Sequence, residues 1–168
     1  MISHWEELWY AFVTKPRHEK KVKSYLETAG FDHYLPLRKT LNQWKDRKRW
    51  VEAPLFPGYI FCRVPFVHRF EVLKAPGMVR IVGFNNQPMP VRETEIETIR
   101  NLLKSGVDLQ VRDGIVVGDY VRITSGILMG LEGRIVEERG AHYFVVTIEA
   151  VGKSILVDTR SIELKKIA

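Results

Sequence analysis

The chain has 168 residues, of which 45% are hydrophobic, and its net charge is +6. This length suits one domain of ordinary size or two small ones, with enough apolar content for packed cores. The single cysteine, Cys62, excludes a disulfide framework and indicates a reducing compartment. The first eight residues include His4, Glu6 and Glu7, and we find neither a signal peptide nor a long apolar run. We therefore expect a cytoplasmic protein with no membrane partner.

The positive charge is unevenly distributed along the chain. Residues 1–108 contain 18 Lys or Arg against 12 Asp or Glu, whereas residues 109–168 contain 8 of each. A concentration of positive charge favours contact with a polyanion, so the first part is the better candidate for such a partner. A solvated basic surface without any partner is the alternative.

A strand is expected at residues 8–13, followed by a helix that has Pro16 in its first turn and Gly30 just beyond its end. Several basic residues crowd the start of this helix, where the positive end of the helix dipole disfavours them. A bound phosphate backbone would offset that effect, and an ordinary solvated helix face is the alternative. The basic residues in this stretch are Lys15, Arg17, His18, Lys20, Lys21 and Lys23.

A second short strand is expected at residues 31–37, and residues 38–52 then form a polar arm with a turn near Asp46. Six of the twelve residues from 38 to 49 are Lys or Arg, and Trp44 and Trp50 flank the tip closely enough to face each other. Cations interleaved with aromatic rings are typical of sites for single-stranded nucleic acid. The alternative is a mobile hairpin whose tryptophans hold its two strands together. The basic residues of the tip are Lys45, Arg47, Lys48 and Arg49.

The segment 54–61 combines two prolines, a glycine and three aromatic residues. Because proline cannot donate to a sheet ladder, the strand at residues 59–64 should have an irregular entry at an edge or bulge. Ile60 and Cys62 would point to one face, and Tyr59 and Phe61 to the other. Two interpretations stay open: both faces are core beneath helices, or the aromatic face is an exposed docking surface.

A short helix at 67–75, a strand at 78–84 and a clear amphipathic helix at 92–105 complete the first domain, residues 1–107. This order of elements predicts an α+β fold, an antiparallel sheet flanked by helices on a ferredoxin-like plan. Residues 108–114 are polar and lack periodicity, so we assign them to a linker. Residues 115–168 then contain five short strands, predicted at 119–123, 133–138, 143–149, 154–157 and 162–164, which indicate a small barrel.

Catalytic and metal motifs are not recognisable in the sequence. Gly152-Lys153-Ser154 resembles the end of a phosphate-binding loop, but Thr147 occupies the position that requires glycine and no helix follows. We interpret it as a hairpin turn. The five histidines show no ligand spacing. We expect no enzymatic activity, no cofactor and no metal.

Four motifs occur in one order across the chain: Trp9-Tyr10, Arg17-His18-Glu19-Lys20-Lys21-Val22, Pro54-Leu55-Phe56-Pro57-Gly58-Tyr59-Ile60-Phe61, and Gly118-Asp119-Tyr120-Val121-Arg122-Ile123 with Gly126 and Gly133. In this order and spacing the sequence resembles the NusG family of transcription elongation factors over almost its whole length. The first part resembles the NusG N-terminal domain. The part from about residue 115 resembles a KOW domain, a five-stranded SH3-like barrel.

This resemblance implies a factor that binds RNA polymerase and bridges the DNA channel. Residues 15–23 would lie beside the non-template DNA strand, and the hairpin would reach that strand or upstream DNA. The gate loop would be met by His68, Arg69 and Phe70. The clamp helices would contact Val13, Phe56, Pro57, Tyr59, Phe61, Phe84 and Ile96.

In this family the barrel recruits a second partner, either Rho or the ribosomal protein NusE. The matching surface comprises Leu128, Met129 and Leu131, for which plain barrel packing is the alternative. The first-helix motif and the tryptophan hairpin resemble specialised UpxY-type antiterminators, which act on surface-polysaccharide operons. A general NusG factor is the alternative. A KOW-containing RNA-binding translation protein is disfavoured, because its barrel should be basic and this one has no net charge.

Overall fold

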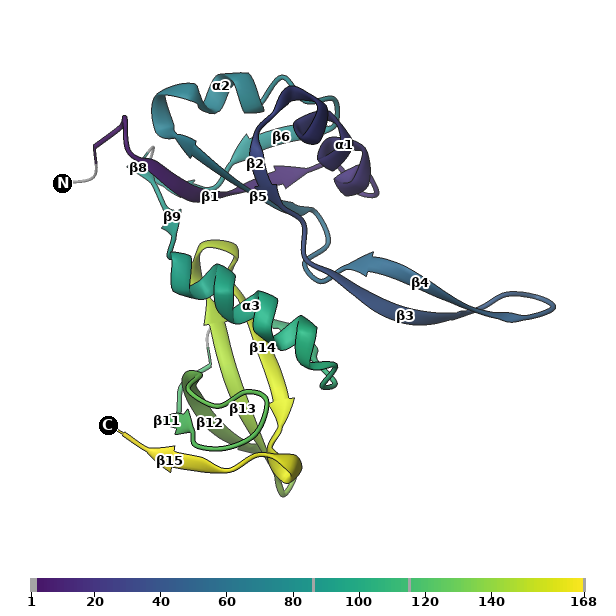
Figure 1. Ribbon diagram of the computed structural model, residues 1–168, viewed down its shortest axis with the longest axis vertical. Coiled ribbons are helices and arrows are strands. Elements are labelled where there is room, and N and C mark those ends of the chain that lie inside the picture. The colour runs from purple at the N-terminus through teal and green to yellow at the C-terminus, as the bar shows by residue number, and fades with distance from the viewer. Residues whose placement is uncertain (1–2, 86, 115, 168) are drawn as a thin grey trace. The chain divides into compact units, whose positions relative to one another are not determined.

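The computed structural model describes residues 3–85, 87–114 and 116–167 and divides the chain into two compact units, residues 1–92 and 93–168 (Figure 1). The boundary predicted from the sequence lies later, at a linker over residues 108–114. Ile115, the first residue of the predicted barrel domain, lies outside the described residues. The division after Arg92 assigns the amphipathic helix to the second unit, and the predicted domain limits stay a prediction.

The first unit is built around strand β1 (Glu7–Thr14). Strand β1 pairs with β5 (Tyr59–Pro65) on one side and with β6 (Met78–Ile81) and β9 (Pro90–Val91) along the other, and β2 (Asp32–Tyr34) pairs with β5. All these pairings are antiparallel. The order β2-β5-β1-β6 places β5 between two strands that are joined through a helix. This arrangement confirms the predicted ferredoxin-like α+β plan.

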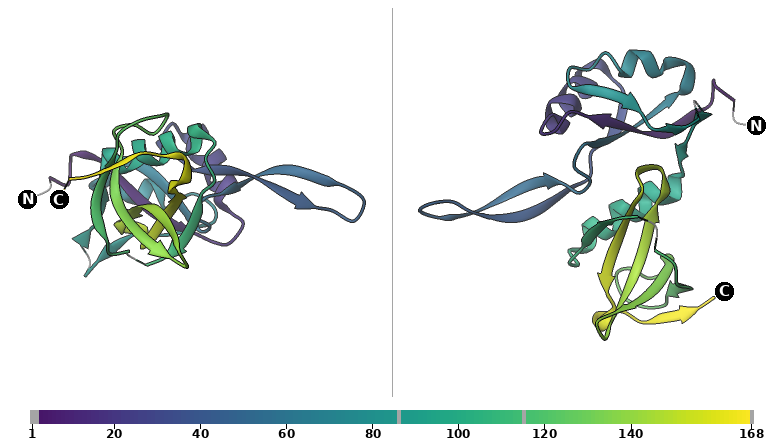
Figure 2. Two further views of the ribbon diagram at one scale, coloured as in Figure 1. Left: turned by 90° about the horizontal axis from the view of Figure 1, so that it is seen from below. Right: turned by 180° about the vertical axis from the view of Figure 1, so that it is seen from behind.

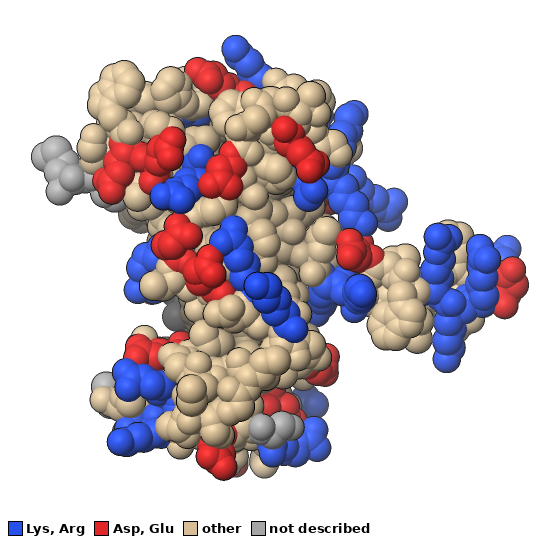
Figure 3. Space-filling model, viewed as in Figure 1, with Lys and Arg blue, Asp and Glu red and all other residues tan. Residues whose placement is uncertain are grey.

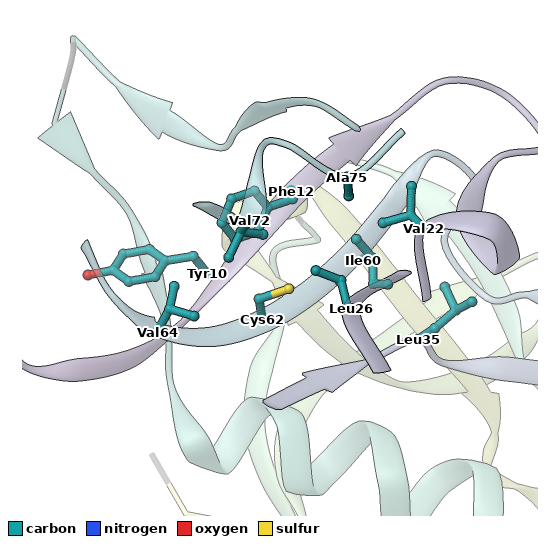
Figure 4. Packing of buried hydrophobic residues seen from close by; sticks show 10 residues of the cluster. All are labelled: Tyr10, Phe12, Val22, Leu26, Leu35, Ile60, Cys62, Val64, Val72 and Ala75. Atoms are coloured by element: carbon teal, nitrogen blue, oxygen red, sulfur yellow. The ribbon is translucent and has the colours of Figure 1, made fainter. Parts of the chain in front are cut away.

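One face of this sheet carries the hydrophobic core of the unit (Figure 4). The register places Tyr10 opposite Cys62 and Phe12 opposite Ile60, so the four side chains share a face. They pack with the apolar side of helix α1 (Glu19–Ala29). Burial, helped by the charge of Asp32, raises the pKa of the Cys62 thiol, which therefore stays protonated. This face is the small, apolar one that the alternation of β5 predicts.

A 3₁₀ turn, η1 (Phe66–His68), and a short helix, α2 (Arg69–Val72), follow β5. The predicted helix at 67–75 is thus present but shorter. The predicted strand at 78–84 is divided, since β6 ends at Ile81 and the two-residue strand β7 begins at Gly83 (Gly83–Phe84). Val82, between them, donates its N–H to the Ala11 carbonyl of β1. Strand β7 pairs with β8 (Gln87–Pro88) in a separate small hairpin.

Strands β3 (Leu37–Gln43) and β4 (Lys48–Pro54) form a two-stranded sheet of their own. Both views in Figure 2 show this ribbon extending away from the rest of the first unit. The Trp44 N–H donates to the Arg47 carbonyl at 2.7 Å, which closes the turn around Asp46 as predicted. We call residues 37–54 the arm.

Helix α3 (Glu93–Ser105) begins one residue after the predicted start at 92 and ends at the predicted residue. Ile96, Ile99 and Leu102 of its apolar stripe are buried. Gly106 follows with φ 72°, the left-handed conformation that commonly ends a helix. Apolar spacing and a terminal glycine were therefore sufficient to locate this helix.

The second unit contains a six-stranded antiparallel sheet in the order β10-β14-β13-β12-β11-β15. The five predicted strands are all present, the last displaced by two residues, and the fold is the expected small SH3-like β domain. Within the predicted linker, Gln110–Asp113 form a strand, β10, and pair with β14, so this stretch is not wholly irregular. The strands are β10 (Gln110–Asp113), β11 (Asp119–Ile123), β12 (Glu132–Glu138), β13 (Ala141–Ile148), β14 (Lys153–Asp158) and β15 (Leu164–Lys166), with 3₁₀ turns η2 (Glu149–Val151) and η3 (Thr159–Ser161).

Strand β10 is polar because it lies at the edge of this sheet, where its side chains are mostly exposed. Arg112 pairs with Glu138 and Asp113 with Lys153. Strand β12 lies in the interior of the sheet, where little space is left beside Gly133. A Cβ on Gly133 would lie 2.5 Å from the Val145 carbonyl oxygen and 2.8 Å from the Phe144 ring. Only glycine fits at that position.

Candidate nucleic-acid and protein interfaces

The end of β1 and the start of β5 bring part of the predicted clamp-helix surface together. Val13 pairs directly with Tyr59, and both side chains are half-buried. Pro57 is exposed in the turn that leads into β5, where Gly58 has φ 84°. The Gly58 carbonyl accepts the Thr14 N–H at 2.8 Å, so this turn is fixed to the end of β1. The irregular entry that two prolines predict is therefore confirmed.

The structure buries other members of the predicted surface. Phe56 and Phe61 are 1% and 0% exposed, with ring centroids 6.2 Å apart in an edge-on arrangement. For these two side chains the structure favours the core interpretation over the docking one. Phe84, in β7, is 73% exposed, whereas Ile96 is buried in the second unit. Pro57 and Phe84 are thus the accessible members, with Val13 and Tyr59 partly accessible.

Helix α1 begins at Glu19, so the prediction that Pro16 occupies its first turn was wrong. Lys15 and Arg17 lie in the preceding turn, and Arg17 has φ 63°, a left-handed conformation that is uncommon for a residue other than glycine. The His18 ring packs against Gly77, where a Cβ would lie 2.8 Å from the His18 Cβ. The basic stretch is therefore a tight turn followed by a helix.

Glu19 is a residue whose role sequence reasoning missed. Its side chain is buried, and one carboxylate oxygen accepts the Gly58 N–H at 2.9 Å. Gly58 is thereby held from two sides, by Glu19 in α1 and by Thr14 at the end of β1. A carboxylate in the first turn also offsets the crowding of cations near the dipole. The signal in the sequence was an acid isolated within a basic run.

Replacing Glu19 with alanine should lower the free energy of unfolding of the first unit by about 1–3 kcal/mol, because the Gly58 N–H loses its acceptor. Glu19→Gln keeps an acceptor oxygen and should have a smaller effect. Urea titration followed by circular dichroism measures both changes. Glu27→Ala is the control, since the Glu27 side chain is exposed and pairs with Lys23 at the surface. Equal midpoints for Glu19→Ala and Glu27→Ala would contradict this role.

The three lysines of α1 have different surroundings. Lys20 Nζ donates to the Glu52 carbonyl at 2.6 Å, which connects α1 to the base of the arm. Lys23 pairs with Glu27, and Lys21 is exposed. Lys20 therefore connects α1 to the arm, and the two predicted nucleic-acid regions lie on one unit.

The arm is exposed over its whole outer half, and Figure 3 shows Lys and Arg covering much of its tip around one acidic group. Trp44 and Trp50 are 50% and 67% exposed. The prediction that they face each other was wrong: the register pairs Trp50 with Leu41, and Trp44 lies beyond the end of β3 in the turn. The turn between β3 and β4 has four residues, 44–47, and its length decides which residues pair across the two strands. The sequence alone does not specify that length.

The predicted gate-loop residues lie at the junction of η1 and α2. The Arg69 guanidinium lies 4.0 Å from the Phe66 ring centroid and 4.1 Å from that of Phe70, which is 61% exposed. His68 Nδ1 is 3.0 Å from Glu71 Oε1. Sequence reasoning missed Trp5, whose ring lies 6.4 Å from that of His68 and which adds an exposed aromatic group to this surface.

The predicted partner surface of the second unit lies in the loop between β11 and β12. Leu128 is buried, Leu131 is half-buried and Met129 is 68% exposed. Ile127, which the prediction omitted, is 74% exposed. Leu128 therefore follows the barrel-packing alternative, while Met129 and Ile127 project into solvent. Backbone bonds from Gly130 to Ile123 and from Ile123 to Leu131 hold the loop in place.

The Gly152-Lys153-Ser154 motif forms a turn in the structure. Gly152 is the left-handed residue of the turn between β13 and β14, and Lys153 begins a strand, so the predicted hairpin turn is confirmed. Among residues 3–85, 87–114 and 116–167 no group of three potential ligands could hold a metal ion. In the same ranges, none of the helices is long and apolar enough to cross a membrane.

Comparison with known proteins agrees with this arrangement. Residues 7–100 match the family model described as transcription termination factor nusG. The chain is 31% identical over 152 residues to a NusG of Streptococcus pyogenes, described as a transcription termination/antitermination protein, covering 82% of this chain and 84% of the relative. A Helicobacter pylori NusG is 27% identical over 130 residues, covering 70% and 74% of the two chains.

A solved structure on domain interaction in Thermotoga maritima NusG is also similar. It aligns with a TM-score of 0.54 and 26% identity, over 99% of this chain and 100% of that one. The sequence match spans the β1 to α3 region, and the structural match extends over both units. This chain therefore belongs to the NusG family of transcription termination/antitermination proteins.

Proposed function

We propose that this chain is a cytoplasmic, non-catalytic factor that binds RNA polymerase through its clamp helices and makes elongation processive on particular operons. The observation that carries the proposal is the double attachment of Gly58. It joins the Val13–Tyr59 surface to the basic turn and helix through Thr14 and Glu19. In this proposal, the surface that contacts polymerase and the residues that contact nucleic acid would be joined through these hydrogen bonds of Gly58.

The accessible apolar residues supply the polymerase contact in this proposal. Phe84 is exposed and Tyr59 is half-buried, which suits aromatic anchors that become covered on binding, and the exposed Pro57 adds apolar surface close to Tyr59 in the chain. Phe70, beside the stacked Arg69, is suited to a second contact at the gate loop. Lys15, Arg17, Lys21 and the arm would follow the non-template strand of the transcription bubble.

The second unit would recruit NusE or Rho through Met129, Leu131 and the newly identified Ile127. Two apolar side chains projecting from a loop that backbone bonds hold in place suit a protein partner. The basic first-helix motif and the tryptophan arm support a specialised antiterminator of the UpxY type, acting on surface-polysaccharide operons. Similarity to a termination/antitermination NusG over 84% of its length supports the second candidate, a general factor.

Binding of the full chain to core RNA polymerase tests the proposal. Tyr59→Ala and Phe84→Ala should each weaken binding by about 2 kcal/mol, or roughly 30-fold, as aromatic hot spots do. Met129→Ala is the control, because this exposed apolar residue belongs to the other unit. Unchanged affinity in folded Tyr59→Ala and Phe84→Ala variants would reject the polymerase contact. Transcription of an unrelated template and of the native operon then separates the two candidates, since a general factor acts on both.

A further inference from the structure

The face of the arm that carries Trp50 is well suited to bind an unpaired base. The register pairs Trp50 with Leu41, Gln43 with Lys48 toward the tip, and Lys39 with Glu52 toward the base. Because these three pairs alternate with the pairs between them, their side chains share one face of the ribbon. This face offers a broad indole beside a leucine. Toward the tip it carries Lys48, whose cross-strand partner Gln43 is uncharged.

Packing within the arm does not account for the indole. A cross-strand aromatic and aliphatic pair contributes about 0.2–1 kcal/mol to a ribbon, and it does so through the area that it buries. Trp50 is 67% exposed and Leu41 is 46% exposed, so most of the indole surface stays in water. A two-stranded ribbon is marginally stable by itself. An indole left mostly in solvent on such a ribbon is better explained by a ligand that covers it.

Charge identifies the chemistry of that ligand. Lys45, Arg47, Lys48 and Arg49 surround the tip, where Asp46 is the acidic residue. At the base, the Glu52 carbonyl is already engaged by Lys20 of α1. A ligand that stacks on an indole and carries negative charge toward the tip is a nucleotide whose base face is open. In a duplex the base faces are covered by their neighbours, so an indole on this ribbon could reach a base only in a single strand.

We propose that Trp50, supported by Leu41, stacks one unpaired base of a single-stranded nucleic acid while Lys48 binds the adjacent phosphate. The proposal rests on the proposed function only for the origin of that strand in a transcription complex. In this proposal, one face of the arm stacks the base. The basic residues of the whole tip attract the negatively charged backbone. Recognition of this kind is tolerant of sequence, because every base has a face that can stack.

Fluorescence anisotropy with the full chain tests the assignment, using short labelled oligothymidine, an abasic oligonucleotide of equal length and a duplex. Trp50→Ala should weaken oligothymidine binding about tenfold, and Trp50→Phe should retain most of the affinity. Both variants should bind the abasic strand and the duplex as the parent chain does. Oligouridine distinguishes RNA from DNA: tighter binding of either one supports the site and identifies its source.

Val51→Ala is the matched control, because Val51 is the next apolar residue of β4 and points to the opposite face. It should leave all affinities unchanged. Equal losses on all three probes, a loss in Val51→Ala as large as in Trp50→Ala, or no loss in Trp50→Ala would each overturn the inference. Core polymerase binding of the same Trp50→Ala protein keeps the two proposals distinguishable. If Trp50→Ala binds polymerase and also binds all three probes with the affinity of the parent chain, the stacking site fails and the proposed polymerase contact stands.

Discussion

Replacing Gly133 with alanine is expected to destabilise the second unit by about 3 kcal/mol, at the upper end of the range for overpacked interiors. The new Cβ would lie 2.5 Å from the Val145 carbonyl oxygen, an atom of the β13 backbone that cannot turn away. The Phe144 ring, 2.8 Å away, is fully buried and has no space to retreat. Thermal unfolding followed by circular dichroism should show the transition of this unit at a lower temperature.

Gly140→Asn is the control for this prediction. Gly140 lies in the turn between β12 and β13 with φ 78°, and nothing lies within 4 Å of a Cβ built there. Asparagine tolerates that conformation better than most residues, so the variant should unfold close to the parent chain. Unfolding of the two variants at the same temperature would contradict the prediction, because it would show that β12 and β13 move apart to admit a Cβ without loss of stability.

Neutralising the tip of the arm is expected to produce the largest change in nucleic-acid affinity. With Lys45, Arg47, Lys48 and Arg49 replaced by glutamine, affinity for a single strand should fall by about two orders of magnitude near 0.1 M salt. Each phosphate contact contributes about −0.7 to the slope of log affinity against log salt concentration, so losing four should reduce its magnitude by about 3. Titration of a labelled strand at several salt concentrations measures both quantities.

A loss of net charge by itself would weaken binding to some extent, and a second variant separates that effect. Arg139, Lys165 and Lys166 lie in the second unit, and their replacement by glutamine removes three positive charges far along the sequence from the arm. The salt slope of this variant should stay close to that of the parent. If its slope falls as far as that of the arm variant, a diffuse charge effect explains the binding and the arm has no special role.

Elements with strong periodicity were predictable from the sequence. Helix α3 follows from the spacing of Ile96, Ile99 and Leu102 with Gly106 after it, and β5 follows from the apolar run after Gly58, in which both faces are buried. These patterns are local, because the spacing of apolar residues within a short segment is enough to predict which stripe or face is buried. The ferredoxin-like strand order then follows from the sequence of element types.

The errors share a physical origin in contacts between distant residues. Strand β10 is polar because it occupies an edge, and only its pairing with β14 reveals it. The start of α1 depends on a turn held by Gly58 and Gly77, so Pro16 was a misleading signal. The register of Trp50 depends on the length of a turn, and the burial of Phe61 depends on what packs around it. None of these can be derived from neighbouring residues alone.

Strand β1 has a consequence for how the chain is made. It is synthesised well before its partners β5, β6 and β9, and its pairing with β9 joins Trp9 to Val91. At about 5–20 residues per second, the nascent strand waits several seconds for its first partner. During that interval an apolar segment with two open edges is exposed to other chains. Strand β1 is therefore a segment where misassembly during synthesis would begin, and where a chaperone would be useful.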